Sequence, residues 1–262
     1  MQLPSQRQNM NILKFLLPAL LAASGLPLSA AQPTGEQILR QMSAKLASAQ
    51  AFSFKATREI DAALLPGTAL SGKARISALV QRPDSFAVQS VSKDDSRQFI
   101  ADGRTLTVFD ATNNYYAIVP MRKTIDAHID VLDTKFGFTP PLVEFALSNT
   151  YQEFRRQAHS IVFLGRSKAG GGFLGLGGIE CDHLMLKGPV ADAELWIGVQ
   201  DHLPHKMVAT FHRPGHPRLQ VDFLAWNLAA KPTSADFAFT PPKDARKIEM
   251  WTTEKMKAAR KH

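Results

Sequence analysis

The residues of this chain whose types best suit catalysis are Cys181 and His183, which flank Asp182. A cysteine acts as a nucleophile when a base lies within hydrogen-bond reach of its thiol. The surrounding segment alternates like a strand, so the two side chains share a face and lie about 7 Å apart along the chain. That separation is too long for direct pairing. We therefore expect a buried, structural cysteine and no catalytic residue.

Four histidines, His202, His205, His212 and His216, are candidate metal ligands. If His205 and His212 end one strand, their side chains fall on opposite faces, because odd and even positions alternate. No cysteine or carboxylate completes a familiar zinc or copper spacing. We expect no metal site and no cofactor, and we place these histidines in solvated turns.

The glycine-rich segment 170–175 matches the pattern G-x-G-x-x-G of nucleotide-binding loops. Such a loop must be followed by a helix that receives the pyrophosphate, and here a strand is expected instead. The match therefore predicts no nucleotide site. Phe173, Leu174 and Leu176 lie among these glycines, which fits a lid or a contact with a membrane or partner. A hairpin tip packed on the core fits equally well.

The elements around these residues are mostly strands. Alternating segments predict strands at 179–187, 193–199 and 204–212, joined by short polar turns. Earlier segments, with Asp102-Gly103 as a tight hairpin turn, raise the expectation to roughly ten or eleven strands. Strands and helices do not alternate along the chain, so the sheet should be antiparallel.

Helices are expected at three places. Thr34 and Gln37 form a capping box before a helix over 35–49. Thr124 can cap a second helix, and Thr139-Pro140 can open a third. Because a long antiparallel sheet must curl to bury one face, we predict a mainly β (α+β) fold, a curved, half-open antiparallel β-barrel with a helical lid.

The concave face of such a sheet would line an apolar cavity. The residues expected there are Phe54, Ile76, Phe86, Leu195, Ile197, Met207 and Phe211.

The N-terminus is typical of a secretory signal peptide over 1–31. Basic residues precede an apolar run at 15–28, and Ser29-Ala30-Ala31 supplies the small residues of a cleavage site. A membrane anchor is disfavoured, because the run is short and contains helix breakers. We expect a soluble periplasmic protein with a single domain at 32–249 and a basic, flexible tail at 250–262. Either Met1 or Met10 could be the start.

Charge and cysteine usage limit the possible partners. Removal of the predicted signal peptide takes away Arg7 and Lys14, so the net charge of +8 becomes 8 − 2 = +6, which favours transient contact with anionic membrane surfaces. Basic residues are not interleaved with aromatic ones along a stripe, so nucleic acid is not expected. The single cysteine excludes an internal disulfide.

Several short motifs, taken in their order along the chain, resemble a known family. They are Arg82-Pro83-Asp84, Asp102-Gly103, Tyr115-Tyr116, Pro140-Pro141-Leu142, Gly165, Cys181-Asp182-His183-Leu184, Glu194-Leu195-Trp196-Ile197, Leu203-Pro204, Trp226 and the segment 237–242. The family is the domain of unknown function 2092, described as predicted periplasmic proteins. It is similar to the lipoprotein-carrier (LolA/LolB-like) superfamily, which implies a curved sheet and a helical lid over an apolar cavity.

The resemblance implies binding of a hydrophobic ligand. Our first hypothesis is therefore a periplasmic binding or carrier protein for a lipid or a lipoprotein acyl chain. The second is an envelope sensor that binds a lipid or peptide signal and a protein partner, such as an envelope protein or a lipoprotein. An enzyme that uses Cys181 and His183, or a histidine metal site, is the third and least favoured.

Overall fold

The structure is a computed structural model that describes residues 32–65, 72–171 and 177–259. The predicted signal peptide and Phe173, Leu174 and Leu176 lie outside the described residues. In the described part, no helix has both the length and the apolar character needed to cross a membrane.

Strands dominate the described chain. Their bounds are β1 Ala51–Ile60, β2 Lys73–Gln81, β3 Ser85–Ser92, β4 Ser96–Asp102, β5 Thr105–Asp110, β6 Tyr115–Pro120, β7 Ser160–Ala169, β8 Ile179–Lys187, β9 Ala191–Gly198, β10 Pro204–Phe211, β11 Arg218–Asn227 and β12 Arg246–Lys247. The α-helices are α1 Gly35–Ala47, α2 Ile125–Val131, α3 Thr150–Gln157 and α4 Thr253–Ala259. Shorter helical turns are η1 Ala62–Leu64, η2 Leu132–Phe136, η3 Val143–Phe145 and η5 Ser234–Phe237.

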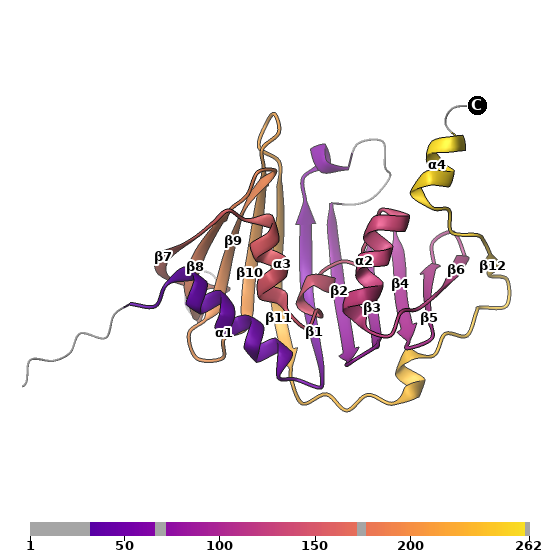
Figure 1. Cartoon of the computed structure of the whole chain (residues 1–262), viewed down its shortest axis with the longest axis horizontal. Helices are drawn as coiled ribbons and strands as arrows, with labels where there is room; N and C mark the ends of the chain where they lie inside the picture. The colour runs from indigo at the N-terminus through magenta and orange to yellow at the C-terminus, as the bar shows by residue number, and fades with distance from the viewer. Residues whose placement is uncertain (1–31, 66–71, 172–176, 260–262) are drawn as a thin grey trace, which may run out of the picture. The chain divides into compact units, whose positions relative to one another are not determined.

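These strands form one curved sheet that stays open. Its order is β12-β6-β5-β4-β3-β2-β1-β11-β10-β9-β8-β7, so β7 and β12 are its edges and no pairing closes it (Figure 1). The central strand β1 pairs with β2 on one side and with β11, the last long strand, on the other. The strand β6 lies near one edge of the sheet and β7 forms the other edge. The chain between them, which contains α2 and α3, therefore runs across the sheet from one edge toward the other. This crossing places helices over the sheet. The predicted half-open β-fold is confirmed.

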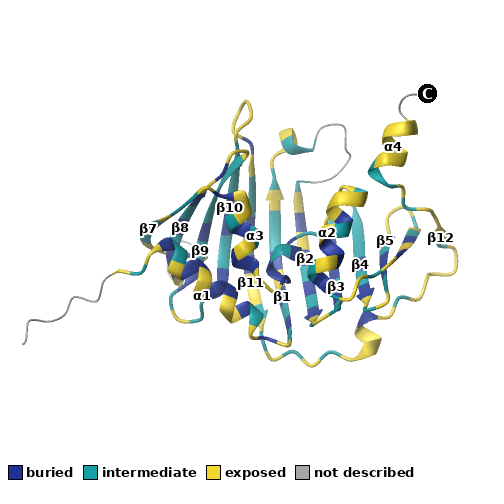
Figure 2. Cartoon of the chain, viewed as in Figure 1, coloured by how far each residue is buried: buried dark blue, intermediate teal, exposed yellow. Residues whose placement is uncertain are grey.

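The helices α1, α2 and α3 lie on one face of the sheet (Figure 1). Their buried residues face the strands and their exposed residues face away (Figure 2). The predicted capping box is present, since Thr34 Oγ1 accepts from the Gln37 amide at 3.2 Å and Gln37 Oε1 accepts from the Thr34 amide at 2.8 Å. This arrangement satisfies backbone donors that the first helical turn leaves free.

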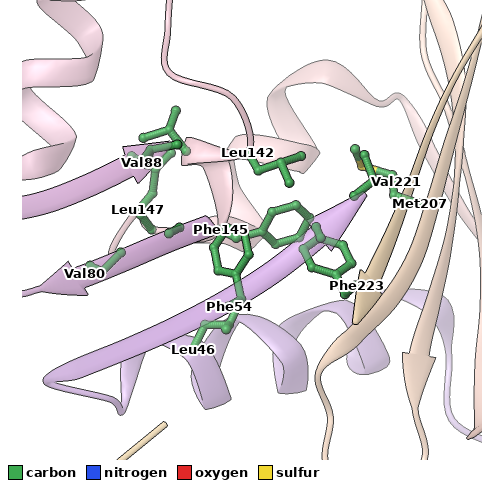
Figure 3. Packing of buried hydrophobic residues seen from close by; sticks show 14 of the residues in the cluster. Leu46, Phe54, Val80, Val88, Leu142, Phe145, Leu147, Met207, Val221 and Phe223 are labelled. Carbon is green, nitrogen blue, oxygen red and sulfur yellow. The ribbon is translucent and has the colours of Figure 1, made fainter. Parts of the chain in front are cut away.

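The apolar core lies between this face of the sheet and the helices. Because side chains alternate along a strand, Phe52, Phe54 and Ala56 of β1 all point into it, and each is at most 3% exposed. Figure 3 shows Phe145 of η3 packed among Phe54, Phe223 and Leu142. The Phe145 and Phe223 rings pack edge to face, with their centroids 5.0 Å apart. The half of the sheet formed by β1 to β6 and the half formed by β7 to β11 therefore share one core.

The strands differ from the prediction at one edge of the sheet. The described chain has twelve strands rather than ten or eleven, because Arg246 and Lys247 add the short strand β12. This strand pairs with β6 in the parallel direction, so the sheet is antiparallel except at this edge. A two-residue strand is too short to show alternation, which is why the sequence pattern did not reveal it.

The predicted helix that begins at Thr139-Pro140 is wrong. Leu142 adopts a left-handed backbone conformation with φ of 61°, and only the short turn η3 follows it. The physical reason is Pro141, because a residue that precedes proline is disfavoured in the helical region, and Pro140 is that residue. The helix forms later as α3, where Asn149 Oδ1 accepts from the Gln152 amide at 3.1 Å. An asparagine in this position is a helix-start signal that the sequence carries.

Candidate ligand-binding cleft

A cleft of about 690 Å³ lies between the sheet and the helical segment 129–158. Its floor is the inner face of β8, β9, β10 and β11, and its walls come from α2, η2, the turn around η3, and α3. The volume falls within the range of about 300–1,000 Å³ that is typical of small-molecule sites. The cleft is therefore large enough for a ligand of that size.

The floor is hollow because small side chains meet there. Ala209 of β10 pairs with Ala193 of β9, and on its other side it pairs with Leu219 of β11. Paired residues of antiparallel strands point to the same face, so these alanines lie together. A methyl group leaves unfilled space where a leucine would pack against the helices. The rest of the floor is also apolar, with Leu186, Met207 and Phe211 among its residues.

The walls combine apolar and acidic side chains. Ile129, Val143, Leu147 and Phe154 supply apolar surface. The charged residues that line the cleft are Asp130, Asp133, Glu144, Glu153 and Arg156. Four of these five are acidic, whereas the whole chain carries a net charge of +8.

Glu144 is the most strongly perturbed of these acids. Desolvation by the surrounding protein, with a further contribution from the charge of Glu153, raises the pKa of Glu144 to about 7. The residue is half-buried and lines the cleft. Sequence reasoning missed Glu144, since the segment around it was expected to be a regular helix.

The predicted cavity residues all lie on the inner face of the sheet, but they separate into two groups. Met207 and Phe211 line the cleft. The other five lie in the packed core, are at most 3% exposed, and do not line the cleft: Phe54, Ile76, Phe86, Leu195 and Ile197. Alternation selects the face of a strand, but it does not show where along that face the helices leave space.

Cys181 is a buried side chain with 0% exposure, as predicted from its residue type. Desolvation raises the pKa of its thiol to about 11, so the nucleophilic thiolate is disfavoured. His183 is engaged elsewhere. Its Nε2 lies 2.8 Å from Glu194 Oε2, and its ring stacks on Trp196 with centroids 4.1 Å apart. These contacts do not form a thiol–imidazole pair.

The prediction that these histidines lie in solvated turns is wrong for His205, which lies on β10 with a side chain only 10% exposed. His205 Nε2 is 2.9 Å from Asp201 Oδ2, and His212 Nε2 is 3.4 Å from Asp192 Oδ1. His202 and His216 have positive φ angles of 55° and 45°. Across the described ranges, no three or more histidine, cysteine, aspartate or glutamate residues gather as a metal site would require.

The fold and the cleft define the structural class of this protein. Its members have an open, curved sheet whose inner face is covered by helices, with an apolar hollow between the two. The chain belongs to the family of predicted periplasmic proteins known as domain of unknown function 2092, which matches residues 35–251. The family resemblance and the periplasmic location predicted from the sequence are confirmed. No curated protein matches the chain.

Solved structures that are similar to this chain share little sequence with it. An uncharacterised conserved protein from Thermus thermophilus is 11% identical with a TM-score of 0.49, and the match covers 82% of this chain and 98% of that one. A LolA superfamily protein from Nitrosomonas europaea is 14% identical with a TM-score of 0.36, covering 79% and 99%. The MucA/MucB complex of Pseudomonas aeruginosa gives 10% identity and a TM-score of 0.43, covering 79% of this chain and 61% of that chain.

Proposed function

We propose that this protein is a periplasmic binding or carrier protein that holds the apolar chain of a lipid or of a lipoprotein in its cleft. The observation that carries the proposal is the hollow of about 690 Å³ above the paired alanines Ala193 and Ala209. An alkyl chain on this floor would leave water for the apolar surface of Leu186, Met207 and Phe211. Each buried methylene group contributes about 0.8 kcal/mol.

The position of the cleft supports a carrier. Its walls belong to the segment between β6 and β7, which rests on the sheet mainly through side chains and is not a strand of it. Small movements of α2 or α3 could therefore admit and release a ligand without breaking the pairing of the strands.

The first experiment identifies the ligand directly. The mature protein is purified from its own periplasm, measured by native mass spectrometry, and extracted with organic solvent for lipid analysis. A stoichiometric lipid or acyl species supports a carrier and names its class. A protein that is empty and also fails to bind a neutral alkyl chain in solution contradicts the proposal.

A substitution that fills the hollow tests whether binding occurs in this cleft. Ala209→Trp places an indole ring on the floor, and we expect affinity for a neutral fluorescent apolar probe to fall about tenfold, because excluding two methylene groups costs roughly 1.6 kcal/mol. The control is Thr210→Trp, on the opposite face of the same strand. Equal affinity of the two variants would place the ligand elsewhere. Thermal unfolding establishes that both variants are folded.

A second candidate function, an envelope sensor that binds a protein partner, is favoured by the edge strand β7. Val162 and Leu164 on this strand are 41% and 49% exposed, and β7 pairs only with β8 among the described strands. Such an edge can accept an added strand. A photo-crosslinker at Leu164 should then capture one defined envelope protein in cells. The same crosslinker at Leu224, exposed in the middle of the sheet, should not.

A further inference from the structure

We propose, on the basis that the cleft binds an apolar chain, that it selects amphiphiles with an ammonium head group and holds that head group at Glu144. This inference adds the chemical class of the head group to the proposed function. It rests on the charges that line the cleft, on the fixed position of Glu144, and on the lack of a side-chain partner for its carboxylate among the described residues.

The charges that line the cleft are mostly acidic and come from the helical side. Asp130 and Asp133 lie on α2 and η2, and Glu153 and Arg156 lie on α3. Arg156 is not free to meet an anionic ligand, because its guanidinium forms an ion pair with Glu153. The floor contributes only uncharged side chains, such as Leu186, Met207 and Phe211.

Glu144 is held in place by its backbone. Thr150 Oγ1 donates to the Glu144 carbonyl oxygen at 3.1 Å, and the neighbouring residues Val143 and Phe145 are 4% and 0% exposed. The backbone of Glu144 is therefore fixed, and its side chain lines the cleft from that position. Preorganisation of this kind reduces the cost of ordering a binding group when the ligand arrives.

The carboxylate of Glu144 accepts a hydrogen bond from its own backbone amide but lacks a side-chain partner within the described part of the chain. No hydrogen bond or ion pair joins it to the side chain of another described residue, whereas Glu153 accepts from both Arg156 and Gln157. That one hydrogen bond from the Glu144 amide does not offset the cost of enclosing the charge, because burial still raises the pKa of Glu144 to about 7. A ligand that supplies a cation to Glu144 would remove this cost.

An ammonium group fits this environment better than the alternatives. A carboxylate or sulfate head would lie among four acidic side chains, with the one arginine of the lining already paired. A hydroxyl head could donate a hydrogen bond to the carboxylate, but only an ammonium head adds the Coulomb attraction of a positive charge to that bond. The cleft should therefore rank amine above alcohol, and alcohol above carboxylate.

The protonation state of Glu144 gives this ranking a pH dependence. Because burial raises the pKa of Glu144 to about 7, the carboxyl group is ionised above this pH and neutral below it. An alkylammonium, with a pKa of about 10.4, stays charged across this range. The other titratable groups of the lining are Asp130, Asp133, Glu153 and Arg156. The preference for the amine should weaken as the pH falls from 8.5 to 5.5.

The experiment is displacement of a neutral fluorescent apolar probe from the mature protein by dodecylamine, dodecanol and dodecanoate, each below its micelle concentration. At pH 8.5 we expect dodecylamine to bind about tenfold more tightly than dodecanol, and dodecanoate more weakly than either. Ethanolamine-headed and glycerol-headed lysophospholipids are compared in the same assay. Preference for the ethanolamine head identifies a phospholipid source of the ammonium group, and lack of that preference beside a strong dodecylamine response identifies a free amine.

The deciding variant is Glu144→Gln, which keeps the shape of the side chain and removes its charge. Affinity for dodecylamine should fall about tenfold, while affinity for dodecanol stays unchanged. The matched control is Glu180→Gln, an exposed residue of β8 that does not line the cleft. If Glu180→Gln lowers the amine affinity as much as Glu144→Gln does, the effect comes from overall charge and the proposal fails.

The outcomes separate this inference from the proposed function. If dodecanol does not displace the probe, the cleft does not hold an apolar chain and both proposals fail. If dodecanol binds but dodecylamine binds no better at pH 8.5, the carrier proposal stands and the ammonium proposal is overturned. Retained dodecanol binding by Glu144→Gln shows that this variant is folded.

Discussion

At the scale of single residues, the least favourable burial of a polar side chain is that of a histidine. His128 of α2 is 0% exposed, and both of its ring nitrogens lack a hydrogen-bond partner in the described part of the chain. Burial, with the nearby charge of Arg122, lowers the pKa of His128 below its ordinary value of 6.5. The folded protein thus favours the neutral imidazole. The stability that depends on it is complete above pH 6.5 and is lost as the pH falls below that value.

We predict that His128→Leu removes part of this acid sensitivity. Leucine of similar size leaves no polar atom without a partner, so the free energy of unfolding at pH 7.5 should be unchanged or higher. Between pH 7.5 and 5.0 the variant should lose less stability than the parent in urea unfolding. The exposed His159→Leu serves as control and should follow the parent. A parallel decline of His128→Leu and the parent would contradict this explanation.

At the scale of elements, the cleft depends on the junction between η3 and α3. Thr150 stands at the first position of α3, is 0% exposed, and donates its hydroxyl hydrogen bond to the Glu144 carbonyl. This bond holds the irregular turn that replaced the expected helix. The same bond therefore contributes both to stability and to the position of the Glu144 side chain.

We predict that Thr150→Val destabilises the protein by about 1 kcal/mol, because valine keeps the shape and leaves a partly buried carbonyl without this donor. Affinity for dodecylamine should fall as well, since Glu144 is held less firmly. Denaturant unfolding and probe displacement measure the two effects. Thr134→Val also removes a threonine-to-carbonyl bond, but at an exposed position, and should change stability by less than about 0.5 kcal/mol. Equal effects of the two variants would count against a special role for this junction.

At the scale of the whole folded unit, Pro33–His262, one core connects the two halves of the sheet. Phe54 on β1 meets Trp226 and Phe223 on β11, with ring centroids 4.8 Å and 5.7 Å apart. Phe145 from the helical segment completes the cluster (Figure 3). Because these contacts cross from one half of the sheet to the other, the halves should not unfold independently.

We predict a single unfolding transition in denaturant, seen equally by tryptophan fluorescence and circular dichroism. Phe54→Ala should shift this transition by about 3–5 kcal/mol, the usual cost of removing a buried phenylalanine. Leu224→Ala, at a position 64% exposed, should shift it by no more than about 0.5 kcal/mol. Two separate transitions would show that the halves of the sheet fold as independent units.

Local sequence patterns determined much of this architecture. Alternation in 179–187 and 204–212 gave strands that agree with β8 and β10, because one face of each strand must be apolar to meet the core. The Thr34 and Gln37 capping box and the Asp102-Gly103 turn depend on bonds between residues a few positions apart. The burial of Cys181 followed from its residue type. Such features can be predicted from the sequence because they depend on the type of one residue or on residues close together in the chain.

The cleft was decided only by the tertiary structure. Ala193 and Ala209 come together because β9 and β10 pair, and Glu144 meets the cleft because the segment between β6 and β7 crosses the sheet. The β9–β10 hairpin was expected from the sequence, but the open space above its alanines and the approach of Glu144 depend on residues far apart in the chain and leave no local signal. Alternation placed Phe54 and Met207 alike on the inner face, but where helices cover that face and where they leave it open is a property of packing in three dimensions.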